Sequence, residues 1–306
     1  CDAQGKIIGL QGIFWDITEK RRAEERLNRA HSELAASREE LRLKNDQMED
    51  DLRMAREFQQ AILPQQYPVF PPGVDPQKSL LQFCHRYFPS GAVGGDFFNV
   101  IALSDAKAGV FICDVMGHGV RSALVTAIMR ALFLELTPLA NDPGRLLTQT
   151  NRDLRAILKQ TGTPLFTTAF YMVVDIERRE VAFANAGHPR PLLIHHTTGK
   201  VELLRNEDGK SRPALGIFDE TVYPTSRTPM QGGDLFMMFT DGLYDVEGPN
   251  EAQFSPEWLF EEVQKRTHLA AGALFDELLD AIRKSSVSGH FADDVCLVGV
   301  EVAEKF

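Results

Sequence analysis

Short apolar runs separated by polar turns dominate the chain from residue 80 onward. Runs of this length predict β-strands, and apolar residues three and four apart predict helices between them. The predicted strands are 80–87, 97–103, 109–113, 167–176, 181–186, 191–195, 200–204, 234–240 and 295–302, and the predicted helices are 119–136, 143–159, 256–266 and 270–284. Runs that follow one another across short polar turns favour antiparallel pairing. The pattern therefore predicts a layered α+β sandwich rather than a doubly wound parallel sheet.

A long helix is predicted upstream, over residues 18–64. This segment has no glycine and no proline before Pro64, and its charges are dense. One apolar seam recurs at every seventh position, formed by Leu27, Leu34, Leu41, Met48, Ala55 and Ile62. A heptad seam predicts a coiled-coil linker through which two copies of the chain form a homodimer. The companion seam is mostly polar, so a single solvated helix is the alternative.

The flanks of this helix indicate the domain boundaries. Residues 5–17 suit one or two short strands with a glycine bend, and Pro64 with the proline-rich stretch 68–76 ends the helix. We therefore expect three parts: residues 1–17, the helical linker 18–64, and one large domain over 65–306. Because the chain opens in mid-pattern at Cys1, we expect it to be a piece of a longer protein.

Composition narrows the setting and the partners. The formal net charge is −10 and the only basic cluster is residues 20–22, so no nucleic-acid partner is expected. The longest apolar helical stretch, 123–136, is interrupted by charges, so no membrane segment is predicted. The cysteines form no CxxC pair, which indicates reduced thiols and a cytoplasmic location; they are Cys1, Cys84, Cys113 and Cys296.

Acidic residues stand at the ends of four apolar runs. Asp114 closes FICD and Asp241 closes FMMFTD, whereas Asp96 precedes FFNVIAL and Asp293-Asp294 precede VCLVGVEV. Each alone is an ordinary turn or cap residue. Together they can converge at one edge of a sandwich, where carboxylates without a cation would repel one another. Oxygen ligands without histidine or cysteine select Mg²⁺ or Mn²⁺, and two such ions, when bound, activate a water for in-line attack on a phosphate ester.

The same segments resemble a known enzyme family. The motifs are similar, in the right order, to those of the SpoIIE-type, RsbU-like serine phosphatases, which are bacterial relatives of the metal-dependent protein phosphatases (PPM). The motifs are GGDFF (94–98), DVMGHG (114–119), NAGH (185–188), TDGL (240–243) and Asp293-Asp294. The resemblance covers about residues 50–302 and includes the lead-in AREFQQAILP (55–64). Upstream, GKIIGLQGIFWDITEKRRAEERL is similar to the end of a PAS sensor domain, so residues 1–17 are expected to be its C-terminal remnant.

The resemblance implies an αββα sandwich of two mainly antiparallel sheets with a two-metal centre at one end. The implied catalytic metal ligands are Asp96, Asp114, Asp241 and Asp293, with Asp114 bridging the two ions; further candidate ligands are the carbonyl of Val115 and the side chain of Asp294. His188 is expected to be structural or to face the substrate rather than to bind metal.

The family also implies an activity and a partner. These are a Mn²⁺- or Mg²⁺-dependent protein serine/threonine phosphatase, without a phosphoenzyme, and a phosphorylated STAS-type anti-sigma-factor antagonist as substrate. An upstream sensor would regulate the enzyme through the helical linker. The chain departs from the family pattern at Met116, where serine is common, and at Cys296, where threonine is common. It also has no clear counterpart of the arginine that grips phosphate in the eukaryotic branch.

Two alternatives remain. A pseudophosphatase would recognise a phosphoprotein without cleaving it, although retention of all four acids argues against this. A histidine kinase is suggested by the sensor tail and by His31 in AHSEL, but the strand-rich stretch 167–204 fits that architecture poorly.

Overall fold

The structure is a computed structural model that describes residues 3–5, 15–162, 164–246, 255–286, 289 and 291–304. Its contacts divide the chain into two units, Cys1–Asp51 and Leu52–Phe306. The strands predicted within residues 5–17 lie largely outside the described residues, so the sensor remnant stays a prediction. No helix in the described ranges is both long and apolar enough to cross a bilayer.

Helix α1 (Thr18–Ile62) confirms the predicted long helix. Every described residue of the first unit is exposed in the single chain. The exposed side chains include four members of the heptad seam, which are Leu27 at 57%, Leu34 at 67%, Leu41 at 65% and Met48 at 56%. In the single chain, the apolar side chains of this seam are therefore exposed to solvent. The last turns of α1, from Leu52, belong to the second unit.

The second unit contains two five-stranded antiparallel sheets. Sheet A has the order β1-β10-β9-β6-β7 and sheet B the order β2-β3-β4-β5-β8. The strands of sheet A are β1 (Leu81–Phe88), β10 (Val295–Val302), β9 (Asp234–Phe239), β6 (Leu192–His195) and β7 (Lys200–Leu203). Those of sheet B are β2 (Asp96–Ser104), β3 (Lys107–Val115), β4 (Thr167–Asp175), β5 (Glu180–Ala186) and β8 (Ser226–Pro229).

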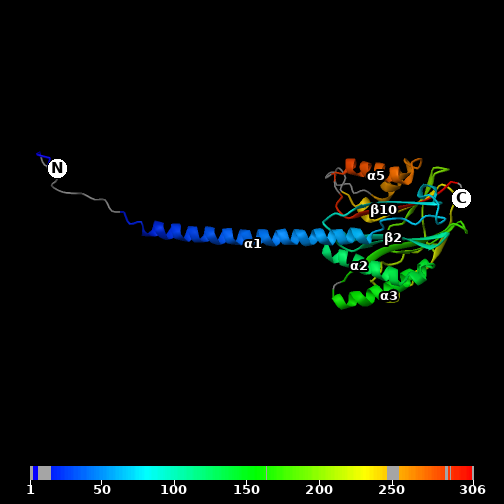
Figure 1. Ribbon diagram of the computed structural model, residues 1–306, viewed down its shortest axis with the longest axis horizontal. Coiled ribbons are helices and arrows are strands. Elements are labelled where there is room, and N and C mark those ends of the chain that lie inside the picture. Colours follow the sequence, from blue (N-terminus) through cyan, green and yellow to red (C-terminus); the bar gives the residue numbers. More distant parts are fainter. Residues whose placement is uncertain are drawn as a thin grey trace. The chain divides into compact units, whose positions relative to one another are not determined.

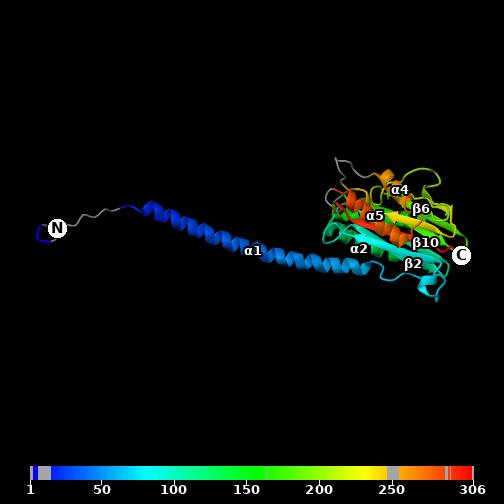
Figure 2. The ribbon, with the colours of Figure 1, turned by 90° about the horizontal axis from the view of Figure 1, so that it is seen from above.

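Two pairs of helices cover the outer faces of the sheets. Helices α2 (Val120–Glu135) and α3 (Pro143–Thr161) lie on sheet B, and α4 (Pro256–Gln264) and α5 (Ala271–Ser285) lie on sheet A (Figure 1). Figure 2, seen from above, shows α4 and α5 in front of strands β6 and β10. The described residues of the unit also form short 3-10 helices at Pro76–Lys78, Thr137–Leu139 and Asp241–Leu243. This arrangement confirms the predicted α+β sandwich of two antiparallel sheets between helices.

The central strands β9 and β10 of sheet A are buried on both faces, which explains their uninterrupted apolar runs. Alternate side chains of a strand point to opposite faces of the sheet. In β10, Cys296 and Val298 join the core between the two sheets, whereas Val295 and Leu297 join the core under α4 and α5. A strand covered on both sides must be apolar at every position. The runs FMMF and VCLVGV therefore indicate central strands.

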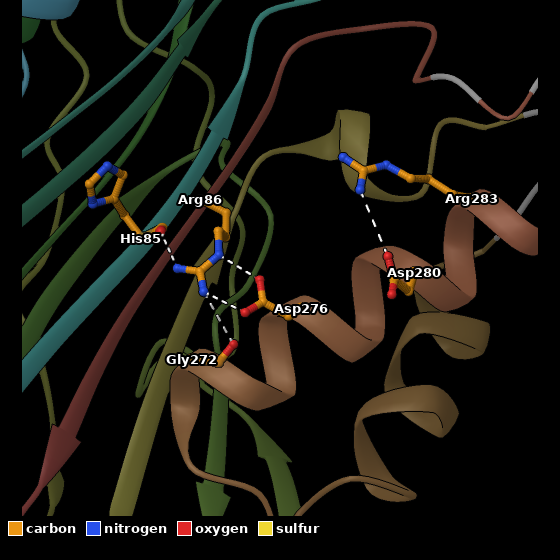
Figure 3. A network of polar contacts seen from close by, with 6 residues as sticks. All are labelled: His85, Arg86, Gly272, Asp276, Asp280 and Arg283. Atoms are coloured by element: carbon orange, nitrogen blue, oxygen red, sulfur yellow. Dashed lines mark hydrogen bonds and ion pairs between the residues drawn. The ribbon is translucent and has the colours of Figure 1, made fainter.

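An ion pair fastens α5 to the edge of sheet A. The guanidinium of Arg86 in β1 donates two hydrogen bonds of 2.7 Å to the carboxylate of Asp276 in α5 (Figure 3). The same guanidinium donates to the carbonyls of His85 at 2.8 Å and Gly272 at 3.5 Å. Bidentate arginine–carboxylate pairs of this type fix orientation as well as proximity. Helix α5 is thereby held in register over β1 and β10.

The two sheets present the acid-bearing strand ends at the same end of the sandwich. Strands β2 and β3 pair antiparallel, so the start of β2 lies beside the end of β3. Strands β9 and β10 are also antiparallel, and the Thr240 N–H donates to the Cys296 carbonyl at 3.0 Å where β9 ends and β10 begins. The antiparallel topology therefore brings the four predicted acid positions toward one end of the two sheets.

Candidate metal centre

Asp96 and Asp114 stand directly opposite each other in sheet B. They are register partners in the β2–β3 pair, so both side chains lie on the same face of the sheet. Asp96 is 1% exposed, and Asp114 is partly exposed. Like charges at directly opposed positions destabilise a sheet. This pair therefore costs stability unless a cation or a proton offsets it.

The acids of sheet A come from two segments that touch. A Cβ added to Gly242 would lie 2.0 Å from the carbonyl oxygen of Asp294, closer than two nonbonded atoms can approach. Only the absence of a side chain at Gly242 lets the TDG and DD segments pack this closely. Asp241 and Asp293 are thereby neighbours. Burial raises the pKa of Asp241, and the Asp293 charge adds to the rise.

Thr240 links the two sheets at the site. Its hydroxyl accepts a hydrogen bond from the Cys296 N–H at 2.9 Å and donates one to Oδ2 of Asp96 at 2.7 Å. Thr240 is fully buried. The Oδ1 atom of Asp96 is also buried, but it has no hydrogen-bond partner among the described residues. One oxygen of this carboxylate is thus held by Thr240, and the other remains available to a ligand.

The charges of these carboxylates raise one another's pKa values across the two sheets. Burial raises the pKa of Asp96 well above its ordinary value, and the Asp114 charge adds to the rise. Burial also raises the pKa of Asp114 to about 7, with further contributions from the charges of Asp241 and Asp293. Strand ends that were merely spread over the surface would not show such coupling. The acids predicted from sequence therefore gather into one electrostatic cluster.

The donor set suits a hard divalent cation. Within the described residues, no group of three or more His, Cys, Asp or Glu side chains is arranged to hold a metal ion. Mg²⁺ usually keeps several waters and uses only one or two carboxylates, so a closed protein shell is not required. The orphaned Oδ1 of Asp96, beside the acidic Asp114, is the buried oxygen that such an ion would satisfy. Asp96, Asp114, Asp241 and Asp293 would hold the ions, and their role as ligands stays a prediction.

Val115 places its backbone beside the Asp96 segment. Its N–H donates to the Gly95 carbonyl at 3.1 Å, and a Cβ on Gly95 would lie 2.7 Å from the Val115 carbonyl oxygen. The absence of a side chain at Gly95 therefore lets the two chain segments meet next to Asp96. This contact places the Val115 carbonyl near the cluster, and its predicted contribution to a metal stays a prediction.

Asp294 holds the loop that leads into β2. Its Oδ1 accepts hydrogen bonds from the N–H of Ser90 at 2.6 Å and from the Ser90 hydroxyl at 2.9 Å. Its Oδ2 accepts from the N–H of Gly95, directly before Asp96. Both oxygens of this carboxylate are thus engaged by the protein. The hydrogen bonds support a positioning role, while the predicted role of Asp294 as a ligand is untested.

Gln59 connects the last turns of α1 to the same loop. The buried side-chain amide donates to the Gly94 carbonyl at 2.7 Å and accepts from the Gly94 N–H at 2.9 Å. Both backbone groups of the residue two positions before Asp96 are therefore paired with one side chain of α1. Sequence reasoning missed both Gln59 and Thr240, although each lies inside a quoted motif.

The NAGH loop is fixed by its own hydrogen bonds. The side-chain amide of Asn185 accepts from the His188 N–H at 2.9 Å and donates to the His188 carbonyl at 3.0 Å. The Nδ1 atom of His188 lies 2.9 Å from the hydroxyl of Thr168, which is the register partner of Asp114. Burial lowers the pKa of His188 to about 3, so its ring is neutral at ordinary pH. These contacts support the expected structural role of His188.

A cleft opens beside the cluster. It has a volume of ≈ 1060 Å³ and is lined by Asp241 together with Thr168, His188 and Tyr244. This volume is at the upper end of the range of ligand pockets in proteins. The cleft therefore gives solvent and ligands access to the Asp241 side of the cluster.

Comparison with known proteins gives consistent matches. The family model described as Stage II sporulation protein E (SpoIIE) matches residues 104–303, a range that contains Asp114, Asp241 and Asp293 but not Asp96. Phosphoserine phosphatase RsbP of Bacillus subtilis (strain 168) is 27% identical over 253 residues, which are 82% of this chain and 58% of that protein. The chain thus spans less than two thirds of this curated relative.

Solved structures share the fold. The SiaA-PP2C domain of Pseudomonas aeruginosa superposes with a TM-score of 0.71 at 22% identity, covering 84% of this chain and 98% of that domain. RsbX, solved in complex with magnesium, has a TM-score of 0.52 at 15% identity, covering 73% of this chain and 96% of that chain. The sandwich is therefore the PP2C-like fold. Since the SpoIIE family model matches well over half of the residues of this chain, the chain belongs to the SpoIIE family.

Proposed function

We propose that this chain is a Mn²⁺- or Mg²⁺-dependent protein phosphatase that hydrolyses phosphoserine or phosphothreonine on a partner protein. The observation that carries the proposal is the pairing of Asp96 with Asp114, with one Asp96 oxygen held by Thr240 and the other buried without a partner. Two divalent ions, when bound, supply the activated water and neutralise the phosphate ester. The relative named a phosphoserine phosphatase supports the same reaction.

The residues of this chain have distinct tasks in that reaction. Asp114 lies opposite Asp96 in sheet B and is influenced by the charges of Asp241 and Asp293, and it is proposed as the bridging ligand. Thr240 and Asp294 hold Asp96 and its loop in place. The substrate protein is proposed to be a phosphorylated STAS-type anti-sigma-factor antagonist, on the basis of the family resemblance.

Metal addition tests the proposal directly. Protein treated with a chelator should not hydrolyse an aryl phosphate or a phosphoserine protein, and Mn²⁺ or Mg²⁺ should restore both reactions. Calorimetry should show divalent-cation binding that is lost in Asp241→Ala. A protein that binds the phosphoprotein without cleaving it at any metal concentration would instead be the pseudophosphatase. A protein that binds no divalent ion would end the metal proposal.

We also propose that α1 mediates homodimerisation and carries a signal from an upstream sensor. The exposed leucines of the heptad seam support the dimer, because a helix with this stripe gains burial only against another helix. The Gln59 hydrogen bonds to Gly94 support the transmission of a signal. A shift of the last turns of α1 would displace Gly94, which lies two residues before Asp96.

Matched leucine substitutions test the dimer. Leu41 lies on the seam and Leu43 lies off it, and both are exposed in the single chain, at 65% and 56%. Burial of a leucine side chain stabilises by roughly 1.5–3 kcal/mol, and about 1.4 kcal/mol corresponds to a factor of ten in affinity. Leu41→Glu should therefore weaken self-association at least tenfold by light scattering or sedimentation, and Leu43→Glu should not. Equal masses and equal phosphatase activities for the wild type and both variants would show that α1 is a tether only.

A further inference from the structure

A small pocket beside the cleft is lined by cations in an otherwise acidic protein. The formal net charge of the chain is −10. The pocket has a volume of ≈ 220 Å³, and no aspartate or glutamate is among its lining residues. Its charged side chains are Arg190, Arg205, Lys210 and Arg212. Such a cluster creates a local positive potential.

Three of these cations form no ion pair with a carboxylate of the described residues. Arg212 pairs with Asp208, but no carboxylate in the described part of the chain lies within ion-pair distance of Arg190, Arg205 or Lys210. Among the described residues, the side chain of Arg190 donates one hydrogen bond, to the Ser211 hydroxyl at 3.4 Å. Elsewhere in the unit, arginines are commonly paired, as Arg86 is with Asp276. Asp208 interacts with Lys210 as well as with Arg212, and Glu202, Glu257 and Glu261 line the adjoining cleft, so the excess of positive charge is confined to the small pocket itself.

The pocket is formed by two loops with defined conformations. The Asn185 amide closes the loop that ends at Arg190, through both backbone groups of His188. A Cβ on Gly187 would lie 2.9 Å from the Ala214 N, so this loop packs directly on the segment that follows Arg212. The second loop is closed by a hydrogen bond of 2.6 Å from the Asn206 amide to the Lys210 carbonyl. The cations therefore project from fixed backbone positions.

The pocket is continuous with the route to the metal centre. Arg190 and Arg205 line both the small pocket and the larger cleft that reaches Asp241. None of the predicted metal ligands lines the small pocket itself. The small pocket could therefore bind an anionic group of the substrate other than the phosphate that reacts at the metal centre.

We propose that Arg190 and Arg205, assisted by Lys210, recognise acidic side chains that flank the phosphorylated residue of the protein substrate. The inference rests on the proposed phosphatase function and names the substrate class: a phosphoprotein with aspartate or glutamate beside its phosphosite. Arginine binds carboxylates through two parallel hydrogen bonds, which gives geometric specificity as well as attraction. A fixed cationic pocket on the cleft wall therefore selects among phosphoproteins that all carry the same scissile group.

Three substrates separate this role from other roles: a phosphoserine peptide flanked by glutamates, the same peptide flanked by alanines, and an aryl phosphate. We expect the double variant Arg190→Gln/Arg205→Gln to lower the kcat/KM ratio of the acidic to the neutral peptide at least tenfold, mainly through KM. The wild-type preference should weaken as salt rises, because exposed charges are screened.

Arg178→Gln, in the β4–β5 turn, is the matched control and should leave the ratio unchanged. Arg190→Glu should shift the preference toward a lysine-flanked peptide.

Two outcomes would overturn the inference. An equal proportional loss on the aryl phosphate and both peptides would show that the arginines grip the scissile phosphate. Unchanged kcat/KM values on all three substrates would show that they are solvated surface charges. Fluorescence anisotropy of a labelled acidic phosphopeptide in the presence of chelator measures the pocket without hydrolysis. Failure of the metal-dependent reaction would therefore count against the phosphatase function, whereas loss of the charge-dependent binding would count against the pocket.

Discussion

Replacing Asp114 by asparagine should lower phosphatase turnover roughly a thousandfold while the fold is retained. Asp114 faces Asp96 across the β2–β3 pair and is electrostatically coupled to Asp241 and Asp293. Metal ions contribute several kcal/mol of transition-state stabilisation, and each 1.36 kcal/mol is about a factor of ten in rate. Asparagine keeps the shape of the side chain but removes the charge that a bridging ligand needs. Steady-state rates with saturating Mn²⁺, together with calorimetric metal affinity, measure the effect.

The same substitution has a second readout in protein without metal. Because burial and the neighbouring carboxylates raise the pKa of Asp114 to about 7, the folded state binds this proton more tightly than the unfolded state does. Stability therefore falls as pH rises from about the ordinary carboxyl pKa of 3.8 through about 7. Chelated wild-type protein should lose on the order of a few kcal/mol of unfolding free energy over this window. The asparagine variant should lose less, and divalent cations should restore the stability of the wild type.

Asp105→Asn is the matched control for both measurements. Asp105 lies in the exposed turn at the other end of the same hairpin, between β2 and β3. The turnover, the metal affinity and the pH dependence of stability of the Asp105→Asn variant should match those of the wild type. Near-normal turnover of the Asp114→Asn variant would contradict the assignment of Asp114 as the bridging ligand.

The sequence predicts most of the sandwich because its central strands are buried on both faces. Strands β9 and β10 place alternate side chains in two separate cores, so their apolar runs are unbroken and easily recognised. Strand β8, Ser226–Pro229, was missed. It is a short polar strand at the edge of sheet B as described, where it pairs with β5. Proline and polar residues are typical of edges and carry no periodic signal.

The candidate site was predictable in its acids but not in the residues that hold them. Asp96 and Asp114 stand out because a charge interrupts an apolar run, and the antiparallel pairing then fixes them opposite each other. Thr240 and Gln59 act through hydrogen bonds to residues that are distant along the chain. A threonine after an apolar run or a glutamine on a helix is individually unremarkable in sequence. Only the folded chain shows which buried group each one satisfies.

Gly242→Ala should be among the most destabilising single substitutions near the site. Its Cβ would lie 2.0 Å from the Asp294 carbonyl oxygen and 3.2 Å from the Asp293 backbone, so the two acid-bearing segments must separate. Forcing atoms into a packed interior costs about 1–3 kcal/mol and occasionally more. We expect a loss of about 3 kcal/mol in the unfolding free energy, measured by chemical denaturation. Metal affinity and turnover should fall as well, because Asp241 and Asp293 would no longer lie side by side.

Gly91→Ala controls for the general effect of removing a glycine. A Cβ at Gly91 would meet nothing closer than 3.8 Å, so no atom has to move. An alanine that fits the native backbone restricts the unfolded chain and stabilises by about 0.4–1 kcal/mol. Gly91→Ala should thus unfold at the wild-type denaturant concentration or slightly above it, with unchanged metal affinity. If Gly242→Ala behaved in the same way, the TDG and DD segments could not be in contact, and the sheet A half of the metal centre would have no structural basis.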